Sequence, residues 1–541
     1  MRTVVIDPVR RHLQLITGGV CLGALVWVLL FWRIGAYPLT DGDAAYYGRI
    51  ARNVVETREI LVLRFDPTAP GSDVDKPPLV MWIMAGAFWL LGPTDVAARV
   101  WHGCAALAVG VATGILALRV AGPQAAVLAV GVLVTSGLFF YQAREPLLDI
   151  PLTLFLTAAL ALIADKRMTP SWRRLWGAAV LAGLGIMTKG PVFLALVIPP
   201  IAVVTMLQGQ LRWPPGRTIV LGAAGGLVII LALVLPWHLW VYAKLGAGFF
   251  DMYTGAMSWR RYLTPVHTPG VPIAAYTGFA LVAMIPWTGF VLPAWLTGWR
   301  EGARVPALRF LCLYVLWAIV FFGVSPGRTF GKYLLPTVPA LAVLVGRYLS
   351  EWPAQPHRLT AWMTLAPAVL LTALSGYAWA TDPVGAGAEL GIFLLCLACA
   401  MLTGGVLLLR GATRASAVLL AAGVVAAYVL LIALAVPKVV SLYPEREFAR
   451  TINRTDGRRA RVAVYRTDTL ETMLAFYLDA PRVERLDGEP ALERFLNSPE
   501  PGWVVERTAA PLPPLLRQRL EVVGRGRNAT LLAAKGRGRL D

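Results

Sequence analysis

The chain has 541 residues, of which 57% are hydrophobic and only 15% are charged, and its mean hydropathy is +0.63. These values exclude an ordinary soluble globular protein and indicate a polytopic membrane protein. The formal net charge of +19 also raises the question whether the protein binds nucleic acid. Basic motifs interleaved with aromatic residues on a soluble domain are absent, so arginine-rich cytoplasmic loops explain the charge better, and we expect no nucleic-acid partner.

Apolar stretches long enough to cross a bilayer run from Leu13 to Trp32 and then, almost without pause, from Ala97 to Pro437. At ~20 residues each, they predict an α-helical membrane domain over residues 1–437 with about 13 transmembrane helices. The segment Leu79 to Gly92 is a little short to span and follows two prolines. We therefore expect it to form a surface or re-entrant helix, and the loop 33–78 before it to be external.

Basic residues divide the loops into two sets. The first set carries 12 Lys and Arg residues and comprises 165–174, 208–217, 298–304, 347–358 and 410–414. The second set carries 6 and comprises Lys189, 244–272, 325–332 and 381–389. Because cytoplasmic loops are enriched in Lys and Arg, the first set is expected in the cytoplasm and the second outside, and the carboxyl terminus is then also external.

The composition changes near residue 438. From Lys438 onward the chain carries 19 basic and 14 acidic residues, and long apolar runs cease. Strand patterns at 461–465, 502–506 and 529–534 surround a helical pattern at 469–478. Residues 438–541 are therefore predicted to form a small extracytoplasmic α/β domain. No Gly-rich phosphate loop opens its helix, which argues against a nucleotide site.

The external loop after the first span holds the most chemistry-bearing residues. Asp41 and Asp43 lie beside Tyr46 and Tyr47, and Tyr46 to Val55 reads as a short amphipathic helix. Asp43 stands at a good N-cap position for that helix, so capping alone would explain it. The alternative is that the carboxylates act as a general base or metal ligand on a substrate that arrives through lipid.

Basic residues recur at the boundaries between external loops and helices. Asp75 and Lys76 precede two prolines, where an interfacial ion pair or snorkelling lysine is the structural alternative. Lys189, Arg328 and Lys332 lie on the side of the membrane where the topology rule disfavours basic residues. They indicate a site for a phosphate or pyrophosphate at the membrane surface.

Two further external segments carry candidate residues. Asp149 either caps the next span or joins Asp43 in binding a divalent cation, Mg²⁺ or Mn²⁺. Arg261 and His267 belong to an aromatic-rich external segment that begins near Phe249. That segment suits contact with a sugar ring or an isoprenoid, and interfacial anchoring is the structural alternative.

Ordered motifs between about residues 10 and 350 resemble those of a known superfamily. They are Asp43-Ala-Ala-Tyr-Tyr-Gly-Arg-Ile-Ala-Arg, Asp75-Lys-Pro-Pro, Ala98-Arg-Val, Leu148-Asp, Thr188-Lys-Gly-Pro-Val, Ile285-Pro-Trp and Tyr333-Leu-Leu-Pro. Together the motifs resemble those of the protein O-mannosyltransferase and 4-amino-4-deoxy-L-arabinose (lipid A) transferase superfamily. The chain departs from it at Ala44, where the family often has Glu, and at Tyr253, where the aminoarabinose branch has His.

The resemblance implies a GT-C fold and an inverting glycosyltransferase of the cell envelope. Such an enzyme moves a sugar from a polyprenyl phosphate to a lipid, glycan or protein acceptor on the external face of a bacterial inner membrane, lipid A modification being one example. It assigns the base to Asp43, a second or metal-binding acid to Asp149 and the phosphate contact to Lys76. A lipid or solute transporter is the alternative, although transporters place charged sites near the bilayer midplane within repeated halves, and no repeat is seen.

Overall fold

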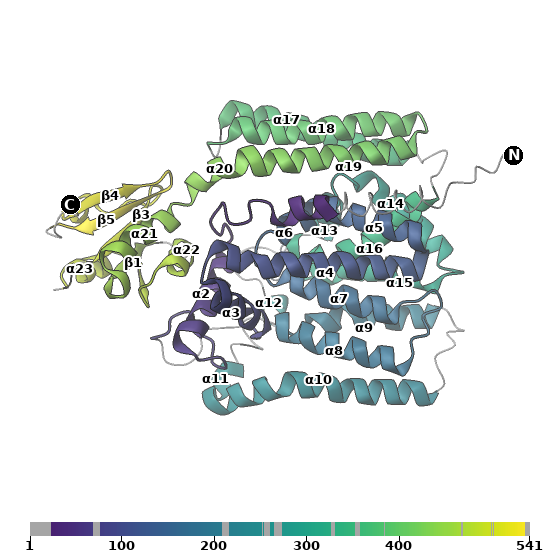
Figure 1. Ribbon diagram of the computed structural model, residues 1–541, viewed down its shortest axis with the longest axis horizontal. Helices are drawn as coiled ribbons and strands as arrows, with labels where there is room; N and C mark the ends of the chain where they lie inside the picture. Colours follow the sequence, from purple (N-terminus) through teal and green to yellow (C-terminus); the bar gives the residue numbers. More distant parts are fainter. Residues whose placement is uncertain are drawn as a thin grey trace.

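The computed structural model describes residues 23–68, 76–207, 216–250, 253, 260–264, 273–325, 331–351, 358–382, 385–466, 469–498, 500 and 502–535. Most of the chain is helical (Figure 1). The helices before the carboxyl-terminal domain are α2 Gly42–Thr57, α3 Leu79–Leu91, α4 Asp95–Ala121, α5 Pro123–Thr135, α6 Gly137–Ala143, α7 Asp149–Ile163, α8 Trp172–Lys189, α9 Val192–Leu207, α10 Gly216–Leu245, α11 Ala247–Phe250, α12 Arg260–Leu263, α13 Ile273–Ala283, α14 Thr288–Glu301, α15 Pro306–Gly323, η2 Gly331–Thr337, α16 Val338–Ser350, α17 Arg358–Thr381, α18 Gly387–Leu409, α19 Thr413–Leu430, η3 Leu431–Ala435, α20 Val436–Val439 and η4 Val440–Leu442.

Within the described residues, 7 helices are long and apolar enough to cross a membrane, or up to 9 if each of two bent pairs forms one span. The pairs α5 with α6 and α13 with α14 bend by 66° and 107°. Helices α7 and α9 are apolar but shorter. The polytopic helical fold is thereby confirmed, whereas the expected number of about 13 crossings stays a prediction, since the first expected span begins before residue 23.

The degree of burial separates inner from outer helices. In an 18-residue apolar window of the span Gly331–Ser350, 78% of the residues are buried, against 17% in such a window of Val220–Leu245. Helix α10 packs mainly against α8 and forms one edge of the helical array in Figure 1, while α17, α18 and α19 pack on one another at the opposite edge. Large apolar side chains such as Val228 and Leu239 are exposed on α10. An all-apolar helix with little internal contact is expected to face lipid tails.

The carboxyl-terminal domain is a five-stranded sheet with the order β2-β1-β3-β5-β4. Strands β1, β2 and β3 are parallel, and β5 is antiparallel to its two neighbours. The elements are α21 Glu445–Thr455, η5 Gly457–Arg459, β1 Val462–Tyr465, α22 Thr469–Tyr477, β2 Val483–Leu486, α23 Glu489–Leu496, β3 Trp503–Arg507, α24 Pro514–Arg517, β4 Leu520–Arg525 and β5 Ala529–Ala534.

Strand β1, which lies between β2 and β3, is buried on both faces. Val462 and Val464 contribute to one hydrophobic cluster, and Ala463 and Tyr465 contribute to the other. A parallel strand covered by helices or loops on both sides has this fully apolar sequence. The three strand patterns and the helix found in the sequence are confirmed here, and β2 and β4 are additional.

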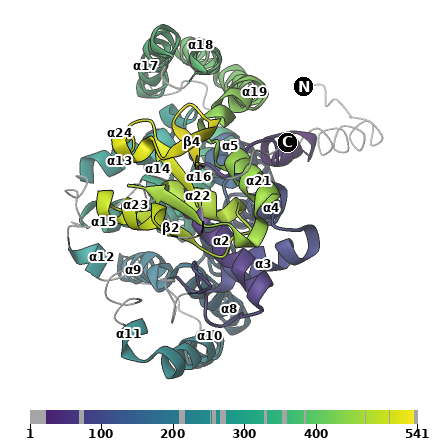
Figure 2. The same cartoon turned by 90° about the vertical axis from the view of Figure 1, so that its left-hand side faces the viewer.

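The external-loop elements and the carboxyl-terminal domain share one end of the molecule. Figure 1 shows α2, α3, α11 and the sheet domain together at the left, and Figure 2 views that end directly. The loop between α17 and α18 reaches the same end, because Glu389 pairs with Lys438 at 2.5 Å. Helix α3 packs against α2 and α4 and, with 13 residues, is one of the shorter apolar helices, so its expected place at the membrane surface stays a prediction.

Candidate active site

Helix α2 places two carboxylates side by side at its amino end. The helix begins at Gly42, and Asp41 is its N-cap, whose Oδ1 accepts a hydrogen bond from the Asp43 backbone N at 2.9 Å. The sequence-based expectations of a helix starting at Tyr46 and of Asp43 as its cap were therefore wrong. Ala44 and Ala45 are good helix formers, and the extra upstream acid takes the capping role. The side chain of Asp43 is 61% exposed and is not needed for the cap.

Lys332 brings η2 to this helix end. Its Nζ lies 3.3 Å from Asp43 Oδ2 and 3.5 Å from Asp41 Oδ2. The lysine follows Gly331 at the start of the buried span, so its stem is half-buried and its ammonium reaches the surface. One cation is thus shared between two carboxylates that come from a segment about 290 residues away.

A second ion pair joins α7 to α8. Lys189 Nζ lies 2.5 Å from Asp149 Oδ1, and the Asp149 side chain is only 5% exposed. Asp149 is the first residue of α7 and makes no side-chain cap bond, which rules out the capping alternative. The Lys189 ammonium also stands 4.6 Å from the centre of the Tyr333 ring, next to Lys332 in the chain. Because Tyr333 adjoins Lys332 in η2, this contact brings the two ion pairs next to each other, and we treat them as one candidate site.

The charges of this site suit a phosphate better than a divalent cation. Each lysine can exchange its carboxylate for a phosphate oxygen, with a charge-assisted hydrogen bond in either state. No group of three or more His, Cys, Asp or Glu side chains that could hold a metal occurs within the described ranges. Asp43 and Asp149 each face an ammonium group instead. The predicted Mg²⁺ or Mn²⁺ therefore does not fit these residues as they are arranged, and no chemical step is assigned to it.

Of the remaining predicted residues, Tyr46, Tyr47 and Lys76 are described by the structure, and the others lie wholly or in their side chains outside the described residues. Tyr46 stacks on Phe65 at 5.2 Å, and Tyr47 is buried in the cluster that joins α2 to α3. Lys76 is half-buried just before α3. Asp75, Arg328 and His267, together with the side chain of Arg261, lie outside the described residues.

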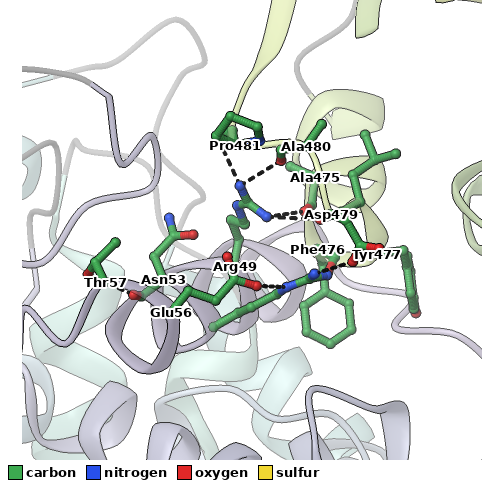
Figure 3. Close-up of polar contacts among 12 residues, drawn as sticks. Arg49, Asn53, Glu56, Thr57, Ala475, Phe476, Tyr477, Asp479, Ala480 and Pro481 are labelled. Carbon is green, nitrogen blue, oxygen red and sulfur yellow. Dashed lines mark hydrogen bonds and ion pairs between the residues drawn. The ribbon is translucent and has the colours of Figure 1, made fainter. Parts of the chain in front are cut away.

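The sheet domain is attached to α2 by buried arginines (Figure 3). The Arg49 guanidinium donates to four backbone oxygens at 2.7 to 3.2 Å, those of Ala475, Leu478, Ala480 and Pro481. Arg52 donates to Phe476 O and pairs with Asp479 at 2.5 Å. The Phe476 ring lies so close to Gly48 that a Cβ there would meet it at 2.8 Å.

This docking role was missed from the sequence. Both arginines read as the polar, solvated face of an amphipathic helix, and Arg49 is in fact 1% exposed. Burial, with a smaller contribution from Arg52, lowers the pKa of Arg49 to about 10, so the guanidinium remains charged at neutral pH. Gly48, which lets Phe476 approach, was the only local signal for a close contact.

The fold is a helical membrane fold of the GT-C architecture, as the sequence predicted. The chain superposes on ArnT from Cupriavidus metallidurans bound to undecaprenyl phosphate with a TM-score of 0.79, covering 97% of this chain and 100% of that chain at 20% identity. The same protein in the apo state gives a TM-score of 0.78 at 19% identity, over 96% of this chain and 98% of that chain. At this identity the likeness establishes the fold.

Sequence comparisons find similar proteins of the predicted kind. The profile of the family described as dolichyl-phosphate-mannose-protein mannosyltransferase matches residues 75–240. The undecaprenyl phosphate-alpha-4-amino-4-deoxy-L-arabinose arabinosyl transferase of Yersinia pestis is 27% identical over 346 residues, 62% of this chain and 59% of the relative. The protein of that name from Pectobacterium atrosepticum is 27% identical over 351 residues, 61% and 59%. The predicted resemblance is confirmed, and the chain spans about three fifths of the length of these relatives.

Proposed function

We propose that the protein is a glycosyltransferase that moves a sugar from a polyprenyl-phosphate donor to a lipid, glycan or protein acceptor at the external membrane face. The observation that carries the proposal is the exposed Asp43 carboxylate beside Lys332, next to the Lys189–Asp149 pair. The relatives named as undecaprenyl phosphate-aminoarabinose transferases support the donor class and make lipid A a candidate acceptor. A transporter is less well supported, because these charges gather at the end that carries the sheet domain.

The geometry supports a single displacement. The acceptor hydroxyl oxygen attacks the anomeric carbon while the bond from that carbon to the phosphate oxygen breaks, and Asp43 takes the hydroxyl proton. Lys332 and Lys189 stabilise the negative charge that develops on the departing polyprenyl phosphate, and Lys76 is the third predicted phosphate contact. One displacement inverts the anomeric configuration. Asp149 holds the Lys189 ammonium at 2.5 Å until the phosphate arrives.

The deletion strain provides the direct test of function. Mass spectrometry of its lipid extract and cell-envelope glycans should show the loss of one glycosyl unit, and the wild-type gene should restore it. An unchanged set of glycans, with accumulation of an untransported lipid or solute instead, would favour the transporter.

The proposed location is a bacterial inner membrane with the site and the carboxyl-terminal domain outside. Asp41, Asp149 and Glu389 all contact lysines at the end of the molecule where the sheet domain docks. We therefore expect a periplasm-active reporter fused after Asp541 to be active, and one inserted in the loop 165–174 to be inactive. A carboxyl-terminal fusion that is active only in the cytoplasm would overturn this topology.

Removing a phosphate-binding lysine should weaken donor binding. We expect Lys76→Ala and Lys189→Ala each to lose about 1.5 to 3 kcal/mol of binding free energy per charged hydrogen bond, which raises the dissociation constant roughly 10- to 150-fold. Binding of undecaprenyl phosphate to the purified protein measures this. The exposed Lys244 at the same end provides the control, since Lys244→Ala should bind like the wild type. Wild-type affinity in both variants would show that these lysines do not bind the phosphate and only extend their ammonium groups to the membrane surface.

A further inference from the structure

Glu145 is a buried acid that the transfer chemistry does not use. It lies between α6 and α7, four residues before Asp149, and is 3% exposed. Its Oε1 accepts a hydrogen bond from Thr40 Oγ1 at 2.6 Å and faces Arg99 Nη2 at 3.3 Å. Within the described residues, its Oε2 has no hydrogen-bond partner. Burial raises the pKa of Glu145, and Arg99 opposes that shift.

Arg99 fixes the chain just before Thr40. The arginine lies on α4 and is fully buried. Its guanidinium donates to three backbone oxygens of the segment before Thr40, those of Tyr37 at 2.8 Å, Pro38 at 2.6 Å and Ile34 at 3.3 Å. Its Nε donates to the carbonyl of Arg144, which adjoins Glu145. The carboxylate and the guanidinium therefore form one buried anchor that holds both the first loop and the α6–α7 connection.

The anchor ends next to the site. Thr40 directly precedes Asp41, the N-cap of α2, in the chain. The Asp41 side chain accepts a hydrogen bond from the Asp43 backbone N–H. The position of the Asp43 carboxylate relative to Lys332 therefore depends on where this turn is held. A buried carboxylate with one unpaired oxygen is costly, and well-packed apolar side chains would stabilise the fold as well or better. Such a cost is commonly found where precise placement of a functional group matters.

We propose that Glu145 is a positioning residue of the transfer site, which acts through the Thr40 hydroxyl to hold the Asp41–Asp43 turn against Lys332. The role rests on the proposed glycosyl transfer. Glu145 does not touch the reacting atoms; it sets the place of the base. Loss of the hydroxyl contact should therefore lower the rate of transfer while leaving phosphate binding by the lysines intact.

Thr40 permits a test that leaves the buried ion pair in place. Thr40→Val has nearly the same shape and lacks only the hydroxyl, whereas Thr40→Ser keeps it. Transfer to envelope acceptors is measured in the complemented deletion strain. Undecaprenyl phosphate affinity and hydrogen exchange over the amino end of α2 are measured on the full-length proteins in nanodiscs. Glu145→Gln tests the acid itself, and its thermal midpoint reports whether loss of this ion pair damages the fold, since Arg99 keeps its pair with Asp95 at 3.8 Å.

We expect Thr40→Val to transfer roughly 10- to 100-fold more slowly, the loss typical of a catalytic group misplaced by about 1 Å. Exchange at the amino end of α2 should rise, undecaprenyl phosphate affinity should stay within about twofold, and Thr40→Ser should restore the rate. Unchanged exchange in Thr40→Val, or raised exchange with an unchanged rate, would overturn the positioning role. If the wild-type gene restores no glycosyl unit, both the proposed function and this role are overturned. If Thr40→Val transfers at the wild-type rate, only the positioning role is overturned.

Discussion

Asp43→Asn should lower the rate of sugar transfer by roughly 10²- to 10⁴-fold, the usual cost of losing a general base. The amide keeps the size of the side chain but cannot take the acceptor proton. Since Asp41 caps α2, the substitution removes no cap, and the helix from Gly42 should persist. The loss should therefore appear in turnover rather than in the thermal midpoint of the purified protein.

The matched control is Glu59→Gln in the same external loop. Glu59 is about half exposed, and within the described residues it forms an ion pair with Arg64 rather than with a lysine of the site. It should transfer sugar at the wild-type rate. A folded Asp43→Asn protein with near wild-type turnover would contradict the base assignment and would move it to Asp41 or Asp149.

The membrane fold could be predicted from the sequence because its signal is local. Apolar runs longer than a bilayer core define spans without knowledge of their neighbours. The number of crossings could not be fixed in the same way. Helix α9 contains two prolines and is shorter than a full span, and the α13–α14 pair is sharply bent. Whether such segments cross the membrane depends on how they pack against neighbouring helices.

The site was predicted in its residue types and only partly in its arrangement. Lys189 and Lys332 stood out because basic residues are disfavoured on that side of the membrane. Asp43 and Asp149 were also predicted as site residues, but their pairing with these lysines was not, because the contacts join residues 289 and 40 positions apart in the chain. Thr40 carried no signal, and Glu145 read only as part of an external acidic segment with Asp149, since a buried acid looks like a solvated one until the fold brings in Arg99.

Arg49→Met should detach or loosen the sheet domain. The substitution leaves four backbone oxygens of the domain facing an apolar side chain, and each buried acceptor left without a donor costs about 1 to 3 kcal/mol. Arg49→Lys should be intermediate, because an ammonium cannot reproduce the planar fork that reaches all four oxygens. Limited proteolysis of the linker near 438–444 and the thermal midpoint should report the change.

Arg58→Met is the control for this experiment. Arg58 is exposed at the carboxyl end of the same helix, so its loss should leave proteolysis unchanged. Because α2 carries Asp43 at one end and the docking arginines along its length, Arg49→Met should also reduce sugar transfer, and it should do so in proportion to the domain released. Wild-type protease resistance in Arg49→Met would show that contacts such as Tyr477 with Asp95 hold the domain without the arginine.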